Sequence, residues 1–115
     1  MSADEAMRQI ETQLSHVWMV RAFLKHSDEA EDDAELQEIH RTLYDYQLAV
    51  GGAWKEQNAE AYLKAARKKF SKLRQVSADF ARIQPEVSAH TNFQMAAASL
   101  AAAVSEIARI LDQAA

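Results

Sequence analysis

The stretch that decides the fold is NAEAYLKAARKKFSKLRQVSADFARIQP, residues 58 to 85, which carries a helix start, a helical stripe and a helix stop. Asn58 is a favourable N-cap, and Pro85 disfavours helical geometry at the residue before it. Between them, mostly apolar residues recur at alternating spacings of three and four, the period of one helix face. This stripe is Leu63, Ala66, Phe70, Leu73, Ser77 and Phe80. The segment therefore predicts an amphipathic helix over 59–84.

Three further segments carry the same pattern. Ser2 with Glu5 forms a capping box before the first stripe, and Asp32 with Glu35 forms one before the second. The four predicted helices span residues 3–26, 33–57, 59–84 and 86–112. Two boundaries have alternatives, because the pair Gly51-Gly52 can end the second helix early and a capping box at Thr91 can start the fourth at 91.

Composition supports an all-α protein. The 115 residues include two Gly and one Pro, too few for the turns of a β protein, and no Cys for disulfides or thiolate chemistry. Four amphipathic helices with short connections predict one domain, an antiparallel up-down-up-down four-helix bundle. The longest uncharged apolar run, 95–104, is short and rich in Ala, so we expect a cytoplasmic protein that does not enter the membrane.

A polar layer is predicted near the end that holds the 27–33 and 84–85 connections. Counting the rise of about 1.5 Å per residue from those connections places one polar residue of each helix at a similar depth. The layer comprises Arg21, His40, Ser77 and His90. These donors suit a small anion, and a weaker alternative is a metal held by His26, His40, Glu86 and His90. The simplest explanation is that these side chains extend to water or bond to carbonyl groups.

A second apolar stripe lies outside the main stripe of the first helix, and two apolar residues of the second helix also lie outside theirs. An exposed apolar face is typical of a partner site, and its residues would be His16, Trp18, Met19, Phe23, Tyr44 and Leu48. The alternative is that the register is shifted and these residues complete a broader core.

The charges are segregated along the chain. Residues 28–38 contain seven acids and no base, whereas residues 61–75 contain six bases and no acid. This polarity favours contact with a second copy or an acidic partner. The formal net charge of −4 makes nucleic acid an unlikely partner.

No catalytic motif occurs in the chain, and no cofactor is expected. The sequence therefore predicts a protein-protein interaction module, most simply a homodimer that uses the second stripe. A bundle that binds a small anion or a metal is the alternative.

Overall fold

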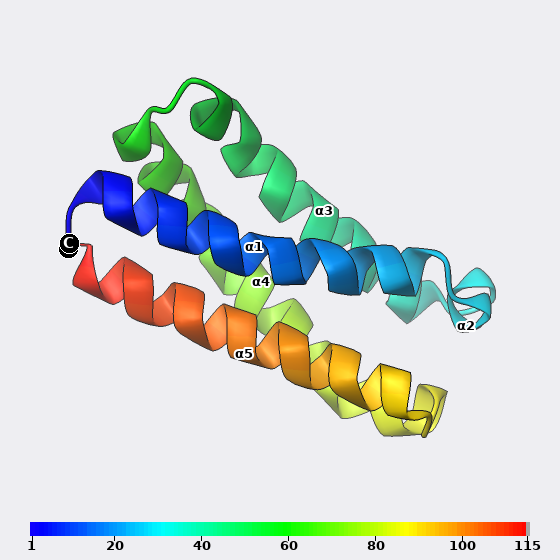
Figure 1. Ribbon diagram of the computed structural model, residues 1–115. Helices are drawn as coiled ribbons and strands as arrows, with labels where there is room; N and C mark the ends of the chain where they lie inside the picture. Colours follow the sequence, from blue (N-terminus) through cyan, green and yellow to red (C-terminus); the bar gives the residue numbers. More distant parts are fainter. Residues whose placement is uncertain (115) are drawn as a thin grey trace.

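The computed structural model describes residues 1–114 and contains five helices and no strand in that part of the chain. The helices are α1 (Ala3–Lys25), α2 (Asp28–Glu31), α3 (Ala34–Lys55), α4 (Ala59–Val87) and α5 (Thr91–Gln113). The prediction of an all-α protein is therefore confirmed. Figure 1 shows α1 and α5 side by side, with the start of α1 and the end of α5 at the same end of the molecule.

Three helix starts follow from capping side chains. Ser2 accepts a hydrogen bond from the Glu5 amide at 3.2 Å, and Asn58 accepts one from the Ala61 amide at 3.1 Å. The predicted cap of the second segment, which is α3, is off by one residue, because Asp33 rather than Asp32 accepts the Leu36 amide at 3.1 Å. Each side chain satisfies one of the amides that a helix start leaves unpaired.

The pair Gly51-Gly52 does not end α3, which continues to Lys55. Gln57 ends it instead, with a left-handed φ of 54°. The amide of Gln57 donates to the carbonyl of Trp54, and that of Asn58 donates to the carbonyl of Ala53. These two bonds form a Schellman motif, in which the left-handed position is usually Gly.

The segment around Pro85 differs most from the prediction. Pro85 lies inside the last turn of α4, which extends to Val87, so the expected stop at 84 is wrong. The start at 86 is also wrong, because α5 begins at Thr91 after His90 accepts the Asn92 amide at 3.0 Å. Pro85 has no N–H to donate to the carbonyl of Ala81, so α4 loses one backbone bond there and ends two residues later.

The short helix α2 was not predicted. Ser27 caps it by accepting the Ala30 amide at 3.3 Å, and its side chain also donates to the carbonyl of Leu24. Gln37 of α3 donates to the carbonyl of Ala30 at 2.9 Å. The acidic connection between α1 and α3 is thus tied to both helices.

The core lies between the four long helices. α1 contacts α3, α4 and α5, and α4 contacts α3 and α5. Residues of all four main stripes are buried, with the largest fully buried side chains being Tyr62, Phe80, Met7, Ile10, Leu14, Leu24, Leu36, Leu43, Leu73, Leu100, Ile107 and Ile110. The molecule is elongated, with extents of 41 × 22 × 19 Å.

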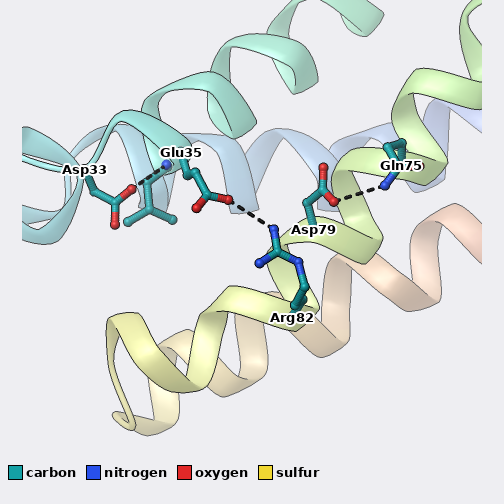
Figure 2. A network of polar contacts seen from close by, with 6 residues as sticks. Asp33, Glu35, Gln75, Asp79 and Arg82 are labelled. Carbon is teal, nitrogen blue, oxygen red and sulfur yellow. Dashed lines mark hydrogen bonds and ion pairs between the residues drawn. The ribbon is translucent and has the colours of Figure 1, made fainter.

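Polar contacts join α3 to α4 near α2 (Figure 2). Arg82 of α4 pairs with Glu35 of α3 at 3.2 Å, beside the capping side chain of Asp33. Nearer the start of α4, the side-chain amide of Gln75 donates to the carboxylate of Asp79 at 3.0 Å. The Arg82–Glu35 pair is exposed, so it contributes at most about 1 kcal/mol to stability.

Candidate interaction surface

Arg21 of α1 lies against two aromatic rings. Its guanidinium carbon is 4.4 Å from the centre of the Trp18 ring and 4.7 Å from that of the Tyr44 ring on α3. The two rings are themselves 6.5 Å apart. Because the aromatic faces attract a cation, the three side chains support one another across the α1–α3 boundary.

Four large apolar side chains around Arg21 are exposed to solvent. The exposed fractions are 43% for Trp18, 66% for Met19, 40% for Tyr44 and 64% for Leu48. We call these four residues together with Arg21 the α1/α3 face. Its exposure agrees with the sequence hypothesis of an apolar surface shared by these helices rather than with a broader core.

The guanidinium of Arg21 has no acidic partner within residues 1–114. The ion pairs found there are Arg41–Glu38, Arg82–Glu35 and Arg109–Glu106. The Nε atom of Arg21 is buried without a hydrogen-bond acceptor. Arg21 is therefore a positive charge at the α1/α3 face with no acidic partner in this part of the chain.

Glu11 supplies a negative charge two turns before Trp18 on the same side of α1. Its carboxylate accepts the hydroxyl of Tyr62 at 2.5 Å, which holds Glu11 against α4. Burial, and then this hydrogen bond to the Glu11 carboxylate, raise the pKa of Tyr62. Sequence reasoning missed Glu11, although its spacing of seven residues from Trp18 indicates a shared face.

A surface hollow lies between the two charges. Its lining comes from α1 and α3 and comprises Glu11, Leu14, Ser15, His16, Trp18, Met19 and Gln47. Gln47 fixes the boundary, because its amide donates to the carbonyl of Leu14 at 3.0 Å. The Oε1 atom of Gln47 is buried and has no partner within the described chain. The hollow is thus apolar in its centre and charged at one edge.

His40 of α3 lies beside this face and is half-buried. Burial is the main cause that lowers its pKa, and the nearby positive charges of Arg21, Arg41 and Lys25 lower it further. The imidazole is therefore neutral near pH 7, so Arg21 and Lys25 supply the charge at this end of the face.

Two predicted interface residues have different surroundings. Phe23 is half-buried, and its ring packs edge-on against Phe93 of α5 at 5.0 Å between centres. His16 is exposed and lines the hollow. Met95 of α5, with 58% exposure, was not predicted and lies with Met19 and Phe23 along the α1–α5 groove.

The predicted polar layer is not assembled in the structure. Arg21 and His40 belong to α1 and α3, whereas Ser77 is buried beside a groove lined by α4 and α5. His90 is an exposed N-cap of α5. Equal depth was a poor guide because it ignores the direction in which each side chain leaves its helix.

The metal alternative has no supporting geometry. His26 and His90 line a polar hollow with Asp28 and Glu29, while His40 lies beside Arg21 and Glu86 is exposed. Within residues 1–114, no group of three or more His, Asp or Glu side chains is arranged to hold a metal ion.

The two charge blocks occupy different helices. The acids of 28–38 lie on α2, in the connection that follows it and on the first turns of α3, and the bases of 61–75 lie on α4. They meet at one hollow between α3 and α4, where Glu38 and Asp45 face Lys69 and Lys72. Acidic side chains of α3 and basic side chains of α4 therefore line the same hollow.

Helix α5 is long and apolar enough to span a membrane by length and composition, with a mean hydropathy of 1.2 over its best window. Core helices of soluble proteins can pass the same test. In this fold the stripe from Phe93 to Leu111 packs into the core.

Comparisons of the chain with protein-family models, with curated proteins and with solved structures find no match. The function of this chain is therefore inferred from the geometry of the α1/α3 face.

Proposed function

We propose that this protein is an interaction module that self-associates through the α1/α3 face. The observation that carries the proposal is the Arg21 guanidinium against the rings of Trp18 and Tyr44, on two helices that also expose Met19 and Leu48. Trp, Tyr and Arg are the residues most often found at the energetic centres of protein interfaces. Aromatic residues, Met and Arg are also enriched in interfaces relative to other surfaces.

The rigidity of the cluster favours binding. Arg21 is stacked on both rings, and Gln47 ties the two helices together beside them. Side chains that are ordered before association lose less entropy when a partner covers them. The face is thus prepared for contact in the isolated chain.

We also propose that the four long helices form an antiparallel up-down-up-down bundle. Support comes from the contacts of α1 with α3 and α5, and of α4 with α3 and α5, together with the short connections between consecutive helices. In this topology α1 and α3 are neighbours that share one outer surface. Such a surface offers a second copy two parallel ridges and the groove between them.

The small-anion alternative is not carried forward. It requires Arg21, His40, Ser77 and His90 to converge, and although His40 lies beside Arg21, Ser77 and His90 line two other hollows.

The proposal is tested by sedimentation equilibrium from low micromolar to several hundred micromolar protein, combined with quenching of Trp fluorescence. A dimer whose formation protects Trp18 from a soluble quencher is expected, and a Trp18→Phe variant separates this signal from that of Trp54. A chain that stays monomeric throughout this range would refute self-association.

A further inference from the structure

Side chains of opposite charge lie along α1 on either side of the exposed residues of the α1/α3 face. Glu11 lies at one end, and Arg21 lies at the other with Lys25 one turn beyond it. Ten residues of helix separate Glu11 from Arg21, which is about 15 Å along the axis. The hollow lined by Leu14, Ser15 and Gln47 lies between these ends.

This arrangement is complementary to itself after a twofold rotation. If two α1 helices pack antiparallel about an axis at the level of residue 16, position 21 of one copy lies level with position 11 of the other, and the reverse contact forms at the same time. Twofold interfaces always consist of such paired contacts. The apolar side chains of each copy then meet in the middle of the interface.

We propose, on the basis of the proposed self-association, that the partner is a second copy packed antiparallel on the α1/α3 face, with Arg21 of each protomer paired with Glu11 of the other. Arg21 has no acidic partner within residues 1–114, and only one oxygen of Glu11 accepts the Tyr62 hydroxyl. The second oxygen of Glu11 is available to a guanidinium. Each protomer thus supplies an acid to the guanidinium that has no acidic partner within the described residues of its own chain.

The acidic ends of the molecule do not oppose this packing. Helices that pack ridge into groove cross at an angle, so contact is confined to their middle turns. The acids of 28–38 on one copy and Asp4 and Glu5 on the other therefore diverge from the axis. The bases Lys69 and Lys72 lie on α4, away from the proposed contact.

The experiment uses two charge-reversed chains, Arg21→Glu and Glu11→Arg, each studied alone and as an equimolar mixture by native mass spectrometry. Alone, each variant places two like-charge pairs in the dimer, and we expect its dissociation constant to rise about tenfold or more. In the mixture, every pair is again of opposite charge. The heterodimer should exceed its statistical proportion and recover a dissociation constant near that of the natural chain.

Two outcomes separate this inference from the proposed function. If the natural chain is a dimer but the mixture gives only the statistical proportion of heterodimer, the pairing is wrong and self-association stands. If the natural chain is a monomer, both are wrong. A stable monomer that binds an acidic peptide through Arg21 would also overturn the inference.

Glu11→Arg removes the acceptor of the buried Tyr62 hydroxyl, so circular dichroism and thermal unfolding must show that this variant is folded. If it is not, the neutral variants Glu11→Gln and Arg21→Gln replace it, because Gln keeps an acceptor near Tyr62. Dissociation constants of the two single variants and the double variant then form a cycle. If the double variant raises the dissociation constant by the product of the two single-variant factors, residues 11 and 21 are not coupled and the pairing is wrong.

Discussion

Replacement of Leu48 by Gln is the sharpest test of the α1/α3 face. Leu48 is 64% exposed, so the isolated chain loses little when it becomes polar. Burying a whole Leu side chain contributes about 1.5 to 3 kcal/mol, and covering this exposed part contributes about 1 to 2 kcal/mol. A symmetric dimer contains the residue twice, which gives about 2 to 4 kcal/mol. The dissociation constant should therefore rise about 30- to 700-fold.

Lys68→Gln on α4 is the matched control, because Lys68 is exposed and lies on a helix outside the α1/α3 face. Both substitutions change an exposed helical side chain of similar size to the same polar residue. Sedimentation equilibrium of both variants should show a large effect only for Leu48→Gln, with unfolding free energies changed by about 0.5 kcal/mol or less. Equal dissociation constants for the two variants would refute the assignment of the face.

The remaining predictions concern stability and are measured by urea unfolding. Gln57→Gly should stabilise by about 1 kcal/mol, because Gln57 has a left-handed φ of 54°. Gly51→Ala and Gly52→Ala should each stabilise by about 0.5 to 1 kcal/mol, since an added methyl group meets no atom within 4 Å. Tyr46→Phe should destabilise by about 1 kcal/mol, because the buried hydroxyl donates to the carbonyl of Ala66 at 3.0 Å. The pKa of His40 is lowered on folding, so protonation favours the unfolded chain, and the natural protein should lose more stability than His40→Gln between about pH 7.5 and about pH 5.

Helix existence was predictable because the apolar stripes are long and regular. The stripe from Leu63 to Phe80 lies in α4, and all six of its residues are buried. Boundaries were less predictable, because several nearby residues can act as caps or stops. Gly51 and Gly52 looked like a stop, yet the bonds of the Schellman motif place the end at Gln57. Local sequence offers the candidates, and tertiary packing selects among them.

The candidate site was predictable only in part. Exposure of Met19 and Leu48 follows from their positions outside the main stripes. The role of Arg21 was missed, because the spacing of residues along α1 gave its depth but not its direction. Stacking on Trp18 and Tyr44 depends on how α3 packs beside α1, and that arrangement is not encoded in either helix alone.

The α1/α3 boundary also contains buried polar atoms that have no hydrogen-bond partner within the described residues. Arg21 Nε and Gln47 Oε1 are buried there without a partner within the described residues, and such atoms cost about 1 to 3 kcal/mol each. Both atoms lie next to exposed aromatic and aliphatic side chains rather than in the well-packed core. A boundary selected only for folding would favour smaller or better paired side chains. Retention of this set is explained if the same residues contribute to a contact that forms after the chain has folded.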